Sequence, residues 1–162
     1  MMDRAVLIDT SFFLRFLNEK DPLFKNADNY FKYFIEQKYS LIISTITIAE
    51  YCIGGSIDQL PLKNLQILPF NINHAKRTGE FAKILFEIRR KGEVNFKERT
   101  LIPNDSKLFA QADTEIGIYY FVTSDSESLK AYGILKQHDH PKFQIIDINK
   151  KYTEVFSIID FN

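Results

Sequence analysis

The sequence lacks tryptophan and contains a single cysteine, Cys52, among 162 residues. One thiol excludes an intramolecular disulfide framework, and one Cys with three His cannot form the usual structural zinc site. Net charge is also absent, because 21 basic residues balance 21 acidic ones, which argues against a general nucleic-acid coating protein. The early apolar run at residues 5–8 is too short for a signal peptide or a membrane span. We therefore expect a cytoplasmic protein with no membrane association.

Apolar residues make up 45% of the chain and charged residues 26%, which is the balance of a soluble globular protein. A length of 162 residues suits a single domain over residues 1–162. Fifteen Phe in the absence of Trp predict a core rich in phenylalanine. A helical C-terminal extension is expected from about residue 148, where Tyr152, Val155, Phe156 and Ile159 share one helical face.

Strand and helix patterns alternate along the chain. Continuous apolar runs predict buried strands at residues 5–8, 41–43, 118–122 and 143–146, and residues 65–70 read as a short strand or connector. Apolar spacing of three and four predicts helices in the intervals, at residues 12–17, 24–34, 46–53, 72–90, 104–116 and 126–132. Thr10 or Ser11 is expected to cap the first helix. This alternation predicts a three-layer α/β/α fold around a mostly parallel sheet.

Carboxylates follow two of the predicted strands. Asp9 comes directly after the first strand, and Asp125 follows the strand at residues 118–122. Ligands of parallel sheets bind beyond the carboxyl ends of the strands, where loops and helix N-termini converge. Each Asp is equally compatible with a helix cap or a turn, so the functional reading depends on both together.

Glu50 lies on an apolar helical stripe formed by Ile46, Ala49 and Ile53. Burial of an unpaired charge would cost several kcal/mol, so Glu50 should meet a cation, a metal or hydrogen-bond donors. An ion pair with Lys or Arg, or a place at the solvent edge of the stripe, stays open.

Asp105 stands near a predicted helix start, where capping is the simpler interpretation. Asp113, farther along the same helix, is expected on a solvated face beside Glu115. Asp9, Glu50, Asp105 and Asp125 taken together would supply an oxygen-only site, which suits Mg²⁺ or Mn²⁺ and the hydrolysis of phosphate esters.

These residues resemble the motifs of the PIN-domain ribonucleases, and particularly of the VapC-like toxins of toxin–antitoxin pairs. Residues 7–11 are similar to the first acidic motif of that family and residues 44–50 to the second. Residues 102–105 resemble the third, and residues 122–125, with the hydroxyl of Thr123, resemble the fourth. Order, spacing and structural context agree across most of the chain.

The resemblance implies a metal-dependent endoribonuclease in which the strands before Asp9 and Asp125 are neighbours. It implies that the four acids named above bind Mg²⁺ or Mn²⁺ and carry out catalysis, with Thr10, Ser11 and Thr123 in support. It also implies an RNA substrate, a small antitoxin protein as partner, and a homodimer. The alternative is a non-catalytic module of the same fold that binds RNA or protein without cleaving.

A basic cluster precedes the third motif and is a candidate RNA-binding surface. It comprises Arg89, Arg90, Lys91, Lys97 and Arg99. A solvated helix end is the competing interpretation.

Overall fold

The computed structural model describes residues 4–92 and 101–157, and its centre is a five-stranded, all-parallel sheet in the order β3-β2-β1-β4-β5. The strands are β1 (Ala5–Ile8), β2 (Ser40–Ser44), β3 (Gln66–Leu68), β4 (Ile118–Thr123) and β5 (Gln144–Asp147). Val6, Leu7 and Ile8 of β1 lie opposite Tyr120, Phe121 and Val122 of β4, and opposite Leu41, Ile42 and Ile43 of β2. The first strand is therefore the middle of the sheet, as its fully buried side chains require.

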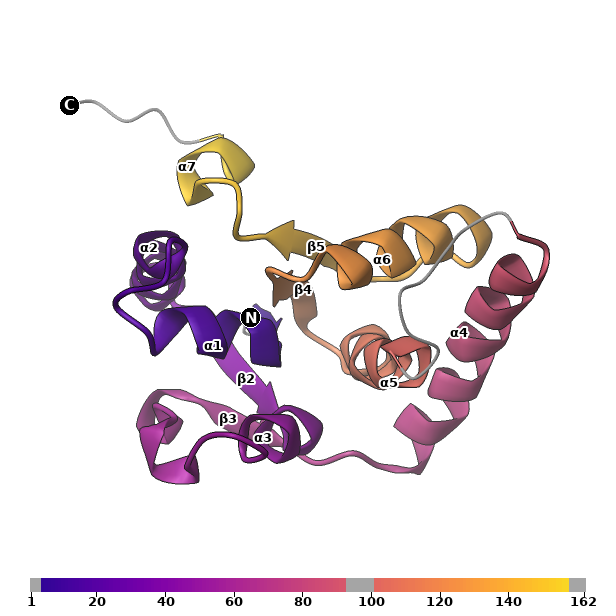
Figure 1. The fold of residues 1–162 in the computed structure, drawn as a ribbon, viewed down its shortest axis with the longest axis horizontal. Coiled ribbons are helices and arrows are strands. Elements are labelled where there is room, and N and C mark those ends of the chain that lie inside the picture. Colours follow the sequence, from indigo (N-terminus) through magenta and orange to yellow (C-terminus); the bar gives the residue numbers. More distant parts are fainter. Residues whose placement is uncertain (1–3, 93–100, 158–162) are drawn as a thin grey trace.

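Helices cover both faces of the sheet. Figure 1 shows α1 and α2 on one side and α4, α5 and α6 on the other. The helices are α1 (Thr10–Phe16), α2 (Phe24–Glu36), α3 (Thr45–Tyr51), α4 (Ile72–Arg90), α5 (Leu101–Thr114), α6 (Ser126–His138) and α7 (Tyr152–Val155), with short 3₁₀ turns η1 (Ile57–Gln59) and η2 (Leu62–Asn64). The predicted three-layer α/β/α fold is confirmed. Within the described ranges, we find no helix with the length and apolarity needed to cross a bilayer.

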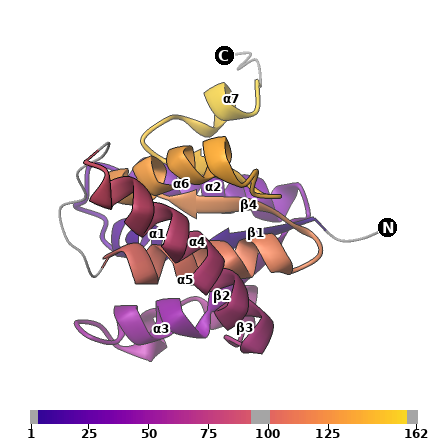
Figure 2. The same ribbon diagram turned by 90° about the vertical axis from the view of Figure 1, so that its right-hand side faces the viewer.

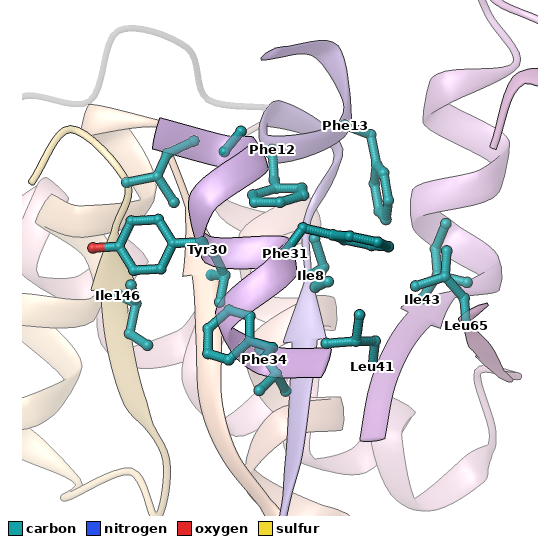
Figure 3. Close-up of a cluster of buried hydrophobic side chains, with 14 of the residues drawn as sticks. Ile8, Phe12, Phe13, Tyr30, Phe31, Phe34, Leu41, Ile43, Leu65 and Ile146 are labelled. Carbon is teal, nitrogen blue, oxygen red and sulfur yellow. The ribbon is translucent and has the colours of Figure 1, made fainter. Parts of the chain in front are cut away.

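Phenylalanine dominates the core on both faces, as its abundance predicts. Under α1 and α2, Phe12, Phe13 and Phe34 pack with Tyr30 and are inaccessible to solvent (Figure 3). On the opposite face the buried rings are Phe81, Phe109, Phe121 and Phe143. Phe109 meets Phe121 edge to face with ring centres 5.0 Å apart, a geometry that adds to the gain from apolar burial.

The C-terminal extension returns across the sheet to α2. The Tyr30 hydroxyl donates to the Lys150 carbonyl (2.8 Å), and the Asn26 amide donates to the Ile148 carbonyl (2.9 Å). The Tyr33 and Phe156 rings stack with their centres 4.5 Å apart. The extension thus contains the expected helix, α7, although that helix spans only residues 152–155. Ile159 lies outside the described residues, and the assignment of residues 1–162 to one domain stays a prediction.

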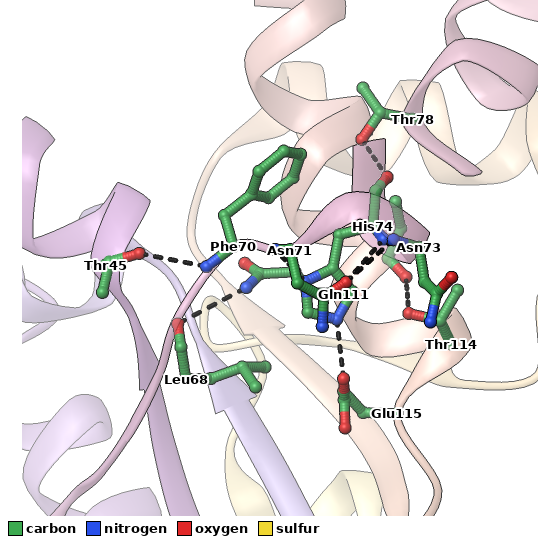
Figure 4. A network of polar contacts seen from close by, with 11 residues as sticks. Thr45, Leu68, Phe70, Asn71, Asn73, His74, Thr78, Gln111, Thr114 and Glu115 are labelled. Carbon is green, nitrogen blue, oxygen red and sulfur yellow. Dashed lines mark hydrogen bonds and ion pairs between the residues drawn. The ribbon is translucent and has the colours of Figure 1, made fainter. Parts of the chain in front are cut away.

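A polar network joins the start of α4 to α5 and β3 (Figure 4). His74 is fully buried; its Nδ1 accepts from the Asn71 backbone N–H (3.0 Å), and its Nε2 lies 2.6 Å from a Glu115 carboxylate oxygen. Because Nδ1 is an acceptor, the ring proton of the neutral form is on Nε2, facing Glu115. The Gln111 amide extends the network by donating to the Leu68 carbonyl (3.5 Å).

Two local expectations are wrong. The helix predicted over residues 46–53 ends at Tyr51, so Cys52 lies beyond it and is exposed. Asp113 is buried rather than solvated: its Oδ2 lies 2.7 Å from Arg77 Nε, and its Oδ1 accepts from the Lys142 backbone N–H (2.7 Å). The cation that pairs with Asp113 comes from α4, so helical periodicity within α5 could not reveal it.

We predict that Asp113→Ala lowers the free energy of unfolding by about 3–5 kcal/mol, because it leaves the half-buried Arg77 guanidinium without its most buried partner. Glu80→Ala is the matched control, since Glu80 pairs with the same Arg77 from the surface and should cost about 1 kcal/mol or less. Urea unfolding measures both changes. Equal losses in the two variants would contradict this account of the α4–α5 contact.

Candidate active site

The carboxyl ends of the central strands carry the candidate acids. Asp9 directly follows β1, Asp125 lies two residues beyond β4, and α3, which bears Glu50, begins directly after β2. The Asp9 backbone N–H donates to the Val122 carbonyl (3.2 Å), which fixes the first strand end beside the fourth. The expected proximity of the segments around Asp9 and Asp125 is therefore a consequence of sheet pairing.

Asp9 is both a helix cap and the most buried of the four acids, with 5% of its surface exposed. Its Oδ1 accepts from the Phe12 backbone N–H (3.0 Å) and from the Ser11 hydroxyl (2.8 Å), and its Oδ2 accepts from the Thr123 hydroxyl (2.6 Å). The expectation that Thr10 or Ser11 caps α1 is wrong, because the carboxylate one residue earlier takes that position.

The two hydroxyls beside Asp9 are oriented by backbone groups. Ser11 Oγ accepts from the Ser124 N–H (2.8 Å), and Thr123 Oγ1 accepts from the Asp125 N–H (3.0 Å). Since a hydroxyl has one proton, these contacts leave each proton directed at Asp9. Both hydroxyls therefore favour the ionised carboxylate, and Oδ2, which accepts one bond, retains capacity for a cation.

Glu50 is held in a way that differs from the expectation. The side chains buried by α3 are Thr47 and Tyr51, whereas Ala49 and Ile53 are exposed, so Glu50 does not lie on a buried apolar stripe. Its partner is the Thr10 hydroxyl, which donates to Glu50 Oε2. Within the described residues, 4–92 and 101–157, Glu50 takes part in none of the ion pairs. Of the alternatives considered, hydrogen-bond donation is the contact observed.

Asp105 and Asp125 reach the same region from α5 and α6. Asp125 caps α6 by accepting from the Glu127 N–H (2.9 Å). Asp105 is the fifth residue of α5, so the capping interpretation is wrong for it. Its Oδ1 accepts from the Ser128 hydroxyl (3.0 Å). Sequence reasoning missed Ser128, although its position one helical turn after Asp125 is a signal that could have identified it.

Burial and the charges of neighbouring acids raise the pKa of two of the four acids, Asp9 and Asp105. Burial, followed by the charges of Asp125, Asp9 and Glu50, raises the pKa of Asp105 from 3.8 to about 7, although the Ser128 hydrogen bond opposes the rise. Burial likewise raises the pKa of Asp9 to about 6, although Thr123, Ser11 and Phe12 oppose the rise; the Asp125 charge adds to it. A bound cation would relieve this repulsion, since it favours the charged form of each group.

The donor set fits a hard divalent cation, because every candidate ligand is a carboxylate oxygen. The described residues nevertheless contain no group of three His, Cys, Asp or Glu side chains arranged closely enough to enclose an ion. The candidate ligands thus share one electrostatic environment without forming a closed cage. Their assignment to metal binding and catalysis stays a prediction.

The basic cluster falls partly within the described chain. Arg90 and Lys91 are exposed and Arg89 is partly exposed at the C-terminal end of α4. Figure 2 shows that this end of α4 lies on the side of the molecule toward which β4 points, where the strand-end acids also lie. Lys97 and Arg99 lie outside the described residues.

The fold and these strand-end acids define a three-layer α/β protein with a candidate oxygen-ligand site at the carboxyl edge of its sheet. The chain belongs to the PIN domain family, whose model matches residues 6–135. No curated protein matches it by sequence.

Solved structures share the fold at low sequence identity. The DNA-bound VapBC of Salmonella typhimurium is 19% identical with a TM-score of 0.56, and the match covers 90% of this chain and 98% of that one. VapBC2 of Rickettsia felis, bound to a promoter DNA fragment, is 18% identical with a TM-score of 0.55, and the match covers 88% of this chain and 98% of that one. VapC20 of Mycobacterium tuberculosis is described as a toxin that cleaves the sarcin-ricin loop. It is 16% identical with a TM-score of 0.53, and the match covers 78% of this chain and 95% of that one.

We predict that Asp105→Asn stabilises the metal-free protein at pH 8 and that this gain shrinks as the pH falls below 7 and disappears by about pH 4. The pKa of Asp105 is higher in the folded protein, about 7, than its ordinary 3.8, so the unfolded chain ionises first and the fold loses stability as the pH rises from about 4 to about 7. Melting temperatures measure the difference, with about 1 kcal/mol corresponding to roughly 2–4 °C.

Asp58→Asn, on the surface, is the control for this substitution. Millimolar Mn²⁺ should raise the melting temperature of the wild type more than that of Asp105→Asn. The electrostatic account would be contradicted if the gain in melting temperature of Asp105→Asn did not depend on pH, or if Asp58→Asn showed the same gain.

Proposed function

We propose that this protein is a metal-dependent endoribonuclease that hydrolyses RNA phosphodiester bonds through Asp9, Glu50, Asp105 and Asp125. The observation that carries the proposal is the gathering of these acids at the carboxyl edge of the sheet, where burial and then the charges of the other three raise the pKa of Asp105. Retaining four mutually repelling carboxylates costs stability, which is consistent with a role that needs a cation.

The cation we propose is Mg²⁺ or Mn²⁺, held by the four acids. When bound, it would supply positive charge at the scissile phosphate and lower the pKa of a water molecule. The hydroxyls position the acids that would hold it: Ser11 and Thr123 orient Asp9, and Thr10 orients Glu50. Ser128 orients Asp105 in the same way from α6.

RNA is the substrate we infer, and three features support it. The fold is that of PIN domains, and VapC20, a structural neighbour, is described as cleaving the sarcin-ricin loop. Arg89, Arg90 and Lys91 lie on the strand-end side of the molecule, where they could contact phosphates. Lys97 and Arg99 belong to the same proposed surface by sequence.

A toxin of a toxin–antitoxin pair is the biological role we propose, with a small antitoxin protein as partner and a homodimer as the assembly. Structural similarity to the VapBC of Salmonella typhimurium and of Rickettsia felis supports the partner. The homodimer rests on the family resemblance.

We predict that the purified protein cleaves RNA with Mn²⁺ or Mg²⁺ and not with chelator. Asp9→Asn should abolish detectable cleavage, because it removes a ligand charge. Ser128→Ala should reduce the rate by about 10–100-fold, as loss of a residue that orients a ligand does. Cleavage of a panel of structured and single-stranded RNAs measures both, with Asp58→Asn as the surface control.

Two results would contradict the nuclease. Cleavage that persists in Asp9→Asn would exclude the proposed site. RNA binding without cleavage, equal in wild type and Asp9→Asn, would favour the non-catalytic interaction module of the same fold.

A further inference from the structure

A groove that includes Thr10 and Glu50 extends beyond the four acids. It lies between α1 and the loop that follows α3, and Thr10 and Glu50 form the end that joins the carboxylate site. Leu14 and Ile53 contribute apolar walls, and they are 55% and 87% exposed. The groove is thus an uncovered apolar surface continuous with a strongly acidic one.

Two successive glycines shape the groove for different reasons. A Cβ on Gly55 would lie 2.6 Å from a Tyr51 ring carbon, so glycine is needed there for the loop to pack on the ring. A Cβ on Gly54 would meet no atom within 4 Å. Since Gly54 also lines the groove, its lack of a side chain leaves space that a larger residue would fill.

Gln59 gives the groove a directional polar group. Its Oε1 accepts from the Tyr51 hydroxyl (3.1 Å) and from the Ser56 backbone N–H (2.9 Å). Both contacts fix the orientation of the amide and use its oxygen. Gln59 lines the groove, and its Nε2 group, with two N–H donors, is the part of the amide left to donate to a ligand.

We propose that this groove binds an unpaired nucleobase of the RNA, adjacent to the phosphate that the acidic site would hydrolyse. The inference rests on the proposed function and extends it to base recognition. A phosphate would bind at the cation, and its neighbouring base needs an apolar surface within one nucleotide's reach. Leu14 and Ile53 supply that surface beside Glu50, and an extruded base can pack against apolar side chains.

The donors of Gln59 predict which bases are preferred. Bidentate recognition of adenine by an amide uses both its oxygen and its nitrogen, and here the oxygen already accepts two hydrogen bonds. Adenine has no carbonyl oxygen, whereas guanine (O6), uracil (O2 and O4) and cytosine (O2) do, and a group that only donates suits a carbonyl; guanine and uracil offer it without the amino group that cytosine carries at C4. We therefore expect guanine or uracil to bind better than adenine.

Saturation-transfer NMR with the four ribonucleoside 5′-monophosphates tests the proposal without requiring turnover. Irradiation of protein methyl groups should saturate the base protons of GMP and UMP, because Leu14 and Ile53 line the groove. Gly54→Leu should weaken that binding by about 5- to 100-fold, the range expected for loss of one base contact. Gly79→Leu is the matched control, since Gly79 also has open space for a side chain, within α4.

Gln59→Glu isolates the donors. Glutamate can still accept the bonds from Tyr51 and Ser56, as the capping-box position allows, but it has no N–H to give. Uracil carbonyls lose their donor, whereas the adenine amino group can donate to the new carboxylate, so the ratio of UMP to AMP affinity should fall toward one. The ratio is informative because the added negative charge weakens all four nucleotides alike.

Several results would overturn the groove assignment: no saturation of base protons in the wild type, equal binding by Gly54→Leu, or a UMP to AMP ratio unchanged in Gln59→Glu. Loss of self-association or of a protein partner in Gly54→Leu, with nucleotide binding intact, would assign the groove to a protein contact instead. If the groove binds bases but the protein does not cleave RNA, the nuclease proposal fails and the base site stands.

Discussion

Parallel pairing of β1 with β4 is the contact on which the site depends. The hydrogen bond from the Asp9 N–H to the Val122 carbonyl extends this pairing to the strand ends. Beyond it, Ser11 and Thr123, one from each strand end, both donate to the Asp9 carboxylate. Thr123 thereby becomes a neighbour of Asp9, although it lies 114 positions later in the sequence. Asp125, which caps α6, and Ser128 in its first turn follow Thr123 into the same region.

Helix α5 carries two carboxylates, Asp113 and Asp105, whose surroundings differ. Asp113 meets a guanidinium and a backbone N–H, so its charge is matched inside the fold. Asp105, about two turns earlier, meets the Ser128 hydroxyl and the fields of three other acids, and its pKa is raised. The same residue type in one helix is a stabilising contact at one position and a source of repulsion at the other. This contrast separates the candidate site from ordinary ion pairing.

The sequence is sufficient to predict the features that depend on local pattern. The strands at 5–8 and 118–122, helix α4 with its end before Gly92, and the strand-end positions of Asp9 and Asp125 follow from apolar runs and turn residues. Features that depend on distant partners were not predictable in this way. The Arg77 partner of Asp113 belongs to another helix. The place of Ser128 one turn after Asp125 is a local signal, but its pairing with Asp105 depends on how two helices pack. The buried face of α3 was misjudged because Thr47 and Tyr51, rather than its aliphatic residues, face the core.

The most direct test of the central claim is anomalous diffraction from crystals soaked in Mn²⁺, collected from wild type and Asp9→Asn. We expect an anomalous peak within coordination distance, about 2.0–2.2 Å, of carboxylate oxygens of Asp9 and at least one other of the four acids, and its loss in the variant. A structure in which Mn²⁺ binds elsewhere, while these four side chains keep their present partners, would contradict the claim that they form a metal site.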